Sequence, residues 1–182
     1  MTLSPEDGKL FYKLWFPLLD YVNEKKKVND LKNIATAGEL DPAKVKEVAN
    51  VLWNDPCIID EYLTEKASEE MAQDEREIIL NWKRCVQGRF LMERHLKKGT
   101  IFISMDTEEV YQVQGIISSW EEMFYGAPMP LVVRATFIPF RKGIISDGLV
   151  IPYNIIIGGG MKKIFKDVYM SAKKNGTIHQ SL

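Results

Sequence analysis

Residues 88–117, GRFLMERHLKKGTIFISMDTEEVYQVQGII, mark the point at which the chain changes from helical to strand periodicity. β-Branched and aromatic residues concentrate in three runs, residues 89–96, 100–105 and 110–117. The segments between these runs, Lys-Lys-Gly and Asp-Thr-Glu-Glu, are typical of turns. The pattern therefore predicts three antiparallel strands in a meander.

The strand pattern continues beyond this stretch. Ser118 or Ser119 can cap a short helix over residues 120–125, and a Gly- and Pro-rich loop then leads into a long strand at residues 131–140. Asp147-Gly148 is typical of a tight hairpin turn, which would pair residues 143–145 with residues 149–151. Five or six short antiparallel strands result.

Single glycines within the strand-rich part favour a bent sheet. Gly115 and Gly143 stand alone at positions where a strand can turn, and a sheet of this size without a long exposed edge usually curls. A final helix is predicted over residues 161–174, where the stop signal Asn175-Gly176 ends it. We expect this helix to pack against the sheet or against the helical part of the chain.

The first half of the chain is predicted to be helical. Helix-start signals occur at Ser4-Pro5, Asp41-Pro42 and Asp55-Pro56, each combining a capping side chain with a ring preset for helix. A fourth helix is predicted over residues 68–86. Pro17 should kink or interrupt the first helix, because its ring removes one backbone donor.

Together these elements predict an α+β fold. An N-terminal helical bundle would pack on a C-terminal antiparallel five- to six-stranded sheet, curled or barrel-like, with a final helix. The boundary falls between residues 86 and 87, which gives a helical subdomain at 1–86 and a β subdomain at 87–182. Because no flexible linker separates the two, we expect them to be rigidly joined, as two subdomains or as one domain.

The two parts differ in charge. Residues 1–81 contain 10 basic and 17 acidic residues, for a net charge of −7, whereas residues 82–182 contain 14 basic and 8 acidic residues, for +6. The asymmetry can reflect mutual attraction of the two parts. It can also indicate an anionic partner for the basic part, although two acidic pairs, Glu108-Glu109 and Glu121-Glu122, dilute its charge.

The composition excludes several classes of protein. With 46% hydrophobic and 27% charged residues, the chain is typical of a folded globular protein. No apolar run approaches the roughly 18–20 residues that span a bilayer, and the N-terminus lacks the pattern of a secretory signal. We therefore expect a cytoplasmic protein with no membrane partner.

Metal and cofactor chemistry has no motif in this sequence. The chain has two cysteines, Cys57 and Cys85, and two histidines, His95 and His179, and none of them belongs to a Cys/His cluster. We expect two buried free thiols within helices, no metal and no cofactor. His95 lies on a predicted strand, where a partly buried structural histidine is the simplest interpretation.

Part of the chain resembles a known group of proteins. A recurrent pattern begins with Trp82, Phe90 and His95 and continues in VYQVQG (110–115) and FIPFRKGIISDG (137–148). Two shorter matches, LW (52–53) and IDEYL (59–63), lie in the helical part. It resembles uncharacterised bacterial proteins with an N-terminal helical part and a small C-terminal β-barrel-like part. The resemblance covers roughly the last 100 residues and implies this architecture and a bacterial cytosolic setting.

That resemblance transfers no site, because no activity is assigned to the group. Some of these proteins carry an added cysteine-rich metal-binding tail, and this sequence contains no such run of cysteines. Metal chemistry is therefore not implied for this chain.

One segment is a candidate anion site. Three glycines, Gly158, Gly159 and Gly160, precede a predicted helix whose first turn carries Lys162 and Lys163. Free backbone N–H groups at a helix start, with two cations beside them, can bind an anion such as a phosphate. The segment lacks both the phosphate-loop and the dinucleotide-binding spacing, so a flexible connection is the alternative interpretation.

A second candidate is a nucleic-acid face on the sheet. Aromatic and basic side chains can stack on bases and neutralise phosphates, and the candidates here are Phe90, Arg94, Phe102, Tyr111 and Arg134. The alternative is that the aromatic rings fill the interior of the barrel, and the RNA-recognition consensus is absent.

No nucleophile motif is present, and adjacent carboxylates such as Glu69-Glu70 and Glu108-Glu109 point in different directions on one element. The leading hypothesis is therefore a non-enzymatic interaction or ligand-binding module with a protein partner or a small ligand. A nucleic-acid-associated barrel is the alternative, followed by an enzyme that acts on a phosphorylated small molecule at residues 158–163.

Overall fold

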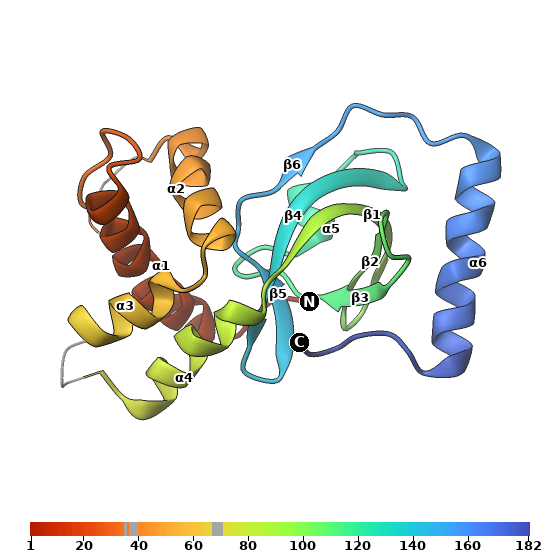
Figure 1. Cartoon of the computed structure of the whole chain (residues 1–182). Coiled ribbons are helices and arrows are strands. Elements are labelled where there is room, and N and C mark those ends of the chain that lie inside the picture. Colours follow the sequence, from red (N-terminus) through yellow and green to blue (C-terminus); the bar gives the residue numbers. More distant parts are fainter. Residues whose placement is uncertain (35, 37–39, 67–70) are drawn as a thin grey trace. The chain divides into compact units, whose positions relative to one another are not determined.

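The computed structural model describes residues 1–34, 36, 40–66 and 71–182. It divides into two compact units: a helical unit, Pro5–Arg84, and a β unit that joins Met1–Ser4 to Cys85–Leu182 (Figure 1). Both the α+β class and the curled antiparallel sheet predicted from the sequence are confirmed. No helix in the described ranges is both long enough and apolar enough to cross a membrane.

The helical unit follows the predicted start signals closely at its second helix. Asp41 caps this helix by accepting a hydrogen bond from the backbone N–H of Ala43 at 2.9 Å, and Pro42 is its first residue. The described helices of this unit are α1 (Pro5–Lys26), α2 (Pro42–Asn54), α3 (Ile58–Glu65) and α4 (Gln73–Asn81), followed by a 3₁₀ turn, η1 (Trp82–Arg84).

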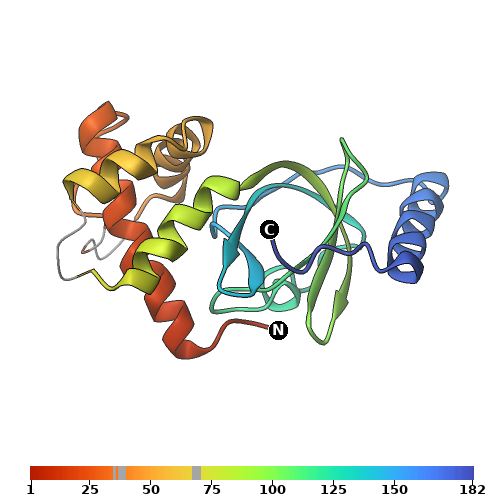
Figure 2. The same cartoon turned by 60° about the horizontal axis from the view of Figure 1, so that its bottom comes forward.

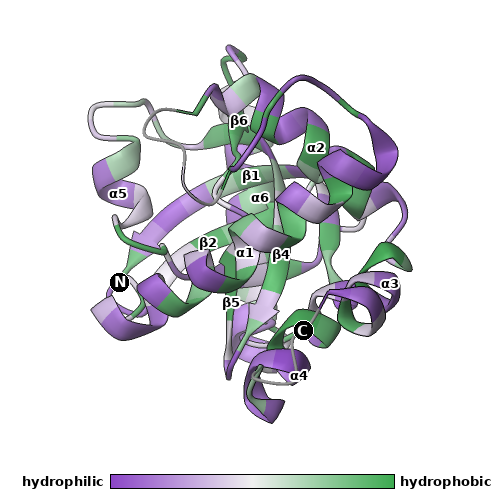
Figure 3. Ribbon diagram, turned by 90° about the vertical axis from the view of Figure 1, so that its left-hand side faces the viewer, coloured by the Kyte–Doolittle hydropathy of each residue, from purple (hydrophilic) through white to green (hydrophobic). Residues whose placement is uncertain are grey.

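Aromatic side chains form the centre of this unit. The Trp15 ring stacks on Trp53 with centroids 5.2 Å apart and meets the Trp82 ring edge-on at 5.7 Å. Phe11 packs against both Trp15 and Trp82. The helices alternate between hydrophobic and hydrophilic residues, as Figure 3 shows, so that each one buries a stripe and leaves the rest to solvent.

Two features of these helices depart from what the sequence indicates. Of the kink or interruption expected at Pro17, the interruption does not occur, because losing one backbone hydrogen bond costs less than exposing the stripe of buried residues on either side of it. The fourth helix ends at Asn81 rather than at Val86, since the chain tightens into η1 and Val86 already pairs with Phe137 of the sheet. Its predicted start, with Glu69 and Glu70, lies outside the described residues.

The cysteines are also placed differently from the prediction. Cys57 is exposed in the turn before α3, and Cys85 is half-buried between η1 and the first strand. Neither lies in a helix. Burial raises the pKa of the Cys85 thiol, so this thiol stays protonated at neutral pH.

The β unit contains a single curled sheet in which the strand order is β3-β2-β1-β4-β5, and β6 pairs with β4. Its strands are β1 (Val86–Leu96), β2 (Gly99–Ser104), β3 (Val110–Val113), β4 (Leu131–Phe140), β5 (Gly143–Ser146) and β6 (Ile151–Pro152). β1 has a bulge between Met92 and Arg94, which breaks the alternation of its side chains.

The first and last strands of this order meet, so the sheet curls into a half-barrel (Figure 2). The backbone N–H of Gln114, next to the end of β3, donates to the carbonyl of Ile144 in β5 at 2.9 Å. Gly115 follows at once, and its backbone pairs with residues 1–3: Leu3 N–H donates to its carbonyl, and its own N–H donates to Met1.

The predicted hairpin at Asp147-Gly148 is wrong. β5 and β6 do not pair with each other; both lie along the same edge of β4, where Phe140 pairs with Gly143 and Arg134 pairs with Ile151. At Asp147-Gly148 the chain leaves β4 briefly after β5 and then pairs with the same edge of β4 again as β6. Gly148 has a φ of 82° and Asp147 Oδ1 accepts from Leu149 N–H at 3.0 Å, so the turn chemistry is local and does not reverse the chain.

Successive side chains along the strands point to opposite faces of the sheet, so the β unit has a separate hydrophobic core on each face. Inside the curl lies the inner core, built around Phe90, Phe102, Tyr111 and Phe137. On the outer face, Leu91, Ile101, Ile103, Val110 and Val132 are covered by Phe165, Tyr169 and Ala172 of the last helix, which together form the outer core.

Two helices complete the β unit. α5 (Trp120–Met123) starts at Ser119 as predicted, with a reciprocal capping box between Ser119 and Glu122. α6 (Gly159–Asn175) ends at Gly176 in a left-handed conformation, also as predicted, and begins two residues earlier than expected. α6 lies against the outer face of the sheet (Figure 1).

Gly115 is the position at which the half-barrel tolerates no side chain. A Cβ there would lie 2.0 Å from the carbonyl oxygen of Ser118. We predict that Gly115→Ala lowers the free energy of unfolding of the β unit by about 1–3 kcal/mol, because the backbone must shift. Hydrogen exchange of the β1 and β4 amides would measure this change.

The control is Gly160→Ala in α6, where a Cβ would meet nothing within 4 Å. This variant should lose no stability and can gain up to about 1 kcal/mol, since alanine is the better helix former. Equal protection of the sheet amides in wild type and Gly115→Ala would show that the close approach at Gly115 is not a constraint.

Candidate functional site

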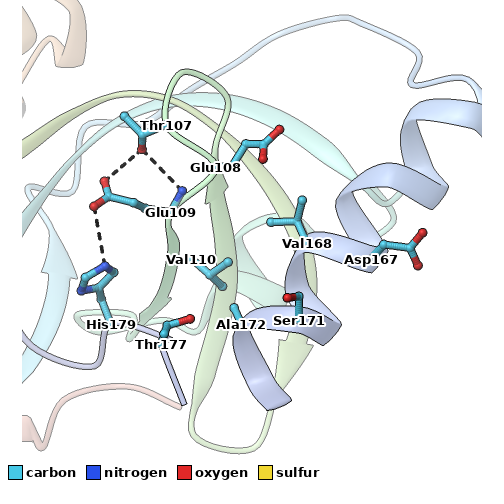
Figure 4. A pocket seen from close by; sticks show the side chains of 10 residues that line it. All are labelled: Thr107, Glu108, Glu109, Val110, Asp167, Val168, Ser171, Ala172, Thr177 and His179. Carbon is cyan, nitrogen blue, oxygen red and sulfur yellow. Dashed lines mark hydrogen bonds and ion pairs between the residues drawn. The ribbon is translucent and has the colours of Figure 1, made fainter. Parts of the chain in front are cut away.

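A groove of about 470 Å³ opens between β3, the turn that precedes it, and α6 (Figure 4). Its lining combines carboxylates, hydroxyls, one histidine and small apolar side chains. The residues are Thr107, Glu108, Glu109, Val110, Asp167, Val168, Ser171, Ala172, Thr177 and His179. All of them belong to the β unit.

The turn between β2 and β3 places the acidic side of the groove. Ser104 Oγ accepts from the backbone N–H groups of Asp106 and Thr107, and Ser104 O accepts from Glu108 N–H at 3.0 Å. Glu108 takes a positive φ of 60°, which lets the chain re-enter the sheet at Val110. Glu109 is thereby fixed at the start of β3.

The segment after α6 supplies the opposite wall. Beyond Gly176 the chain runs alongside β3, where His179 N–H donates to Val110 O at 2.8 Å and Gln112 N–H donates to His179 O at 2.9 Å. The His179 ring stacks on Tyr111 with centroids 5.0 Å apart. Backbone pairing and ring stacking therefore fix the histidine together.

Glu109 is the most constrained carboxylate of the groove. Its Oε2 accepts from the Tyr111 hydroxyl at 2.8 Å and from the Thr107 hydroxyl at 2.9 Å, while its Oε1 lies 3.8 Å from His179 Nε2. The hydrogen bonds from Tyr111 and Thr107 lower the pKa of Glu109. Burial and the neighbouring carboxylate raise the pKa of Tyr111, so at neutral pH Tyr111 donates and Glu109 accepts.

The other two carboxylates are arranged differently. In Figure 4 the Glu109 side chain points toward His179, whereas Glu108 and Asp167 point in other directions. The groove therefore has one converging pair, Glu109 with His179, and two further carboxylates at its margin. No lysine or arginine lines it. Val110, Val168 and Ala172 add apolar side chains on the α6 side of the groove. With carboxylates and no basic side chain in its lining, the groove suits a cationic group.

The described part of the chain contains no cluster of three or more His, Cys, Asp or Glu side chains that could hold a metal ion. The groove has no such cluster either, because its three carboxylates point in different directions.

The anion candidate has the predicted position at a helix start. Gly158 precedes α6 and has no capping side chain, and Gly158, Gly159 and Gly160 face open space. Lys162 and Lys163 are exposed, and Lys162 Nζ donates to the carbonyl of Met129 at 3.4 Å. The lysines thus follow the glycines in sequence, but Lys162 reaches back toward the loop before β4.

The nucleic-acid candidates do not share one surface. Phe90, Phe102 and Tyr111 are at most 3% exposed and pack in the inner core, which is the alternative considered for these rings. Arg94 pairs with Glu93 and lies over the Tyr169 ring, 4.4 Å from its centroid. Arg134 is exposed on β4. Bases can stack only on accessible rings, and these three rings are covered.

No family model, curated protein or solved structure matches the chain. The resemblance to bacterial proteins of similar architecture therefore stays an expectation. The groove is the feature of the structure that bears on function.

The sequence indicated Glu108-Glu109 only as adjacent carboxylates that diverge, and His179 only as a histidine outside any Cys/His cluster. One signal in the sequence could have indicated the cluster: Thr107, Glu109 and Tyr111 alternate, which places them on one side of an extended segment. The contribution of His179 has no local signal. It depends on a parallel backbone pairing across 68 positions, Tyr111 with His179.

Removing the Tyr111 hydroxyl tests the electrostatics of the groove. We predict that Tyr111→Phe raises the pKa of Glu109, because the hydrogen bond that most stabilises its ionised form is lost. A carboxyl group whose pKa is lower in the folded state than in the unfolded state stabilises the fold at pH values above its unfolded pKa. This contribution is lost as the pH falls through the folded pKa. Tyr111→Phe should therefore have a lower free energy of unfolding than wild type at neutral pH. NMR titration of the Glu109 carboxyl carbon measures the shift.

Tyr125→Phe provides the matched control, since Tyr125 is 92% exposed on the same unit. It should leave the titration of Glu109 unchanged. Identical Glu109 titration curves in wild type and Tyr111→Phe would show that the hydrogen bond does not hold the carboxylate ionised.

Proposed function

We propose that the protein is a non-enzymatic binding module whose groove receives a single amine or guanidinium group of a partner or small ligand. The observation that carries this proposal is Glu109, an ionised carboxylate of the groove held in place by hydrogen bonds from Tyr111 and Thr107. A carboxylate whose position is fixed before binding loses little conformational entropy when a cation arrives. It therefore binds a cation more favourably than a mobile surface glutamate does.

The dimensions of the groove support this assignment. A volume of about 470 Å³ lies in the lower part of the range for ligand sites and accommodates one long side chain or a small molecule. The charged end of a lysine or arginine can meet Glu109 while its methylene stem lies along the groove. Glu108 and Asp167 add negative potential at the margin, which favours approach of a cation.

The same lining favours binding over nucleophilic catalysis. A nucleophile needs a base within hydrogen-bond reach, and the His179 ring contacts Glu109 and Tyr111 but is hydrogen-bonded to no hydroxyl of the described lining. The cysteines are outside the lining. The contact between Glu109 and His179 helps to hold the carboxylate in one orientation, which suits binding of a ligand.

The proposal is tested with a pair of probes that differ only in charge. N-acetyl-arginine amide carries the guanidinium, and N-acetyl-citrulline amide replaces it with a neutral urea of the same shape. We predict that the arginine probe shifts the backbone amide resonances of residues 107–110 and 179, and that the citrulline probe does not. Glu109→Gln should weaken the arginine probe about fivefold, or about 1 kcal/mol, as expected for a half-exposed ion pair.

The control variant is Glu121→Gln, an exposed carboxylate on α5 outside the groove. It should bind the arginine probe as wild type does. If both probes bind equally, or if Glu121→Gln weakens binding as much as Glu109→Gln, the groove is not a cation site.

A further inference from the structure

A second surface of the β unit lies apart from the lining of the groove. Between β6 and α6, Ile155 is 52% and Ile156 is 95% exposed, and in the first turns of α6 Met161 is 44% and Ile164 is 52% exposed. Lys162 and Lys163 lie between the last two. We name these six residues the apolar-basic tip. Single exposed apolar residues are ordinary, but four within ten positions are not.

The backbone on both sides of Ile155 and Ile156 is anchored to the β unit. On one side of the isoleucine pair, Tyr153 N–H donates to Val132 O of β4 at 2.8 Å. On the other side, Ile157 is buried in the outer core. Ile155 and Ile156 are thus presented between two anchored residues. The glycines that follow face open space, and Ile156 is almost fully exposed.

The charge of the tip has one sign. Residues 151–166 contain three lysines, Lys162, Lys163 and Lys166, and no acidic residue. The first carboxylate after them, Asp167, lines the groove. An exposed segment that is both cationic and apolar complements an anionic surface into which short apolar side chains can insert.

Two kinds of anionic partner have to be distinguished: a lipid surface and an acidic protein. Lysine is depleted from the cores of protein interfaces, because its strongly hydrated ammonium group is costly to cover. At a membrane surface the same combination is favourable, since isoleucine and methionine enter the boundary of the acyl chains while lysines stay among anionic headgroups. The composition of the tip therefore fits lipid better than protein.

We propose that the apolar-basic tip docks the β unit reversibly on an anionic lipid surface. The sequence predicted no membrane partner because it contains no spanning segment, and docking of this kind requires none. Each apolar side chain enters only the interfacial layer, so binding depends jointly on the isoleucines and on the lysines. Salt weakens it by screening the lysines.

The experiment is co-sedimentation of the full chain with vesicles. We expect binding to phosphatidylcholine vesicles that contain about 30% phosphatidylglycerol, no binding to phosphatidylcholine alone, and loss of binding as NaCl rises from about 0.1 M to about 0.5 M. The double variant Ile155→Ser with Ile156→Ser should reduce the partition coefficient about tenfold. Lys162→Gln with Lys163→Gln should reduce it to a similar extent.

Matched variants separate the tip from general surface properties. Ile117→Ser with Met123→Ser removes two other exposed apolar side chains of the same unit, and Lys173→Gln with Lys174→Gln removes two lysines from the far end of α6. Both control pairs should bind vesicles as wild type does. Circular dichroism establishes that every variant is folded.

Three outcomes would overturn the proposal. The first is no sedimentation with anionic vesicles, and the second is equal loss of binding in the tip variants and the control variants. The third is binding to soluble poly-glutamate together with no binding to vesicles, which would assign the tip to an acidic polypeptide. None of these results depends on the cation groove, so the two proposals stand or fail separately.

Discussion

The ring of Phe137 lies where four strands of the curled sheet meet. It contacts Phe90 of β1, Phe102 of β2 and Tyr111 of β3, with ring centroids 4.2, 5.1 and 5.9 Å away, and it belongs to β4 itself. Such rings bury large areas, and the Phe102 ring meets Phe137 edge-on, so a curled sheet can enclose all four. The inner core therefore determines the curvature, and the curvature brings Gln114 to Ile144, where the first and last strands of the sheet join.

Tyr111 connects this core to the groove. Its ring is buried against Phe90 and Phe137, while its hydroxyl reaches Glu109 and its outer face stacks on His179. The Glu109 carboxylate is therefore held in place by a side chain that is itself fixed in the inner core. A binding group supported in this way is preorganised, which is the property expected of a recognition site.

Sequence patterns predicted those features that depend on neighbouring residues. β4 and the Ser119 cap follow from local propensity and turn chemistry, and both were predicted closely. Asp147-Gly148 misled the prediction because its turn chemistry is real, but β4 offers a free edge on which the chain continues instead of reversing. The groove depends on Tyr111 pairing with His179, a contact between distant positions that no local pattern encodes.

The hydrogen bonds between residues 1–3 and Gly115 make the helical unit an insertion within the β unit. During synthesis, Met1–Leu3 leave the ribosome well before their partner, Gly115, which follows more than a hundred residues later. The helices α1 to α4 can thus form and pack around Trp15 and Trp53 before any strand of the sheet exists. Completion of the sheet then waits for His179, so ribosome stalling anywhere before that residue leaves the β3 edge without its parallel partner.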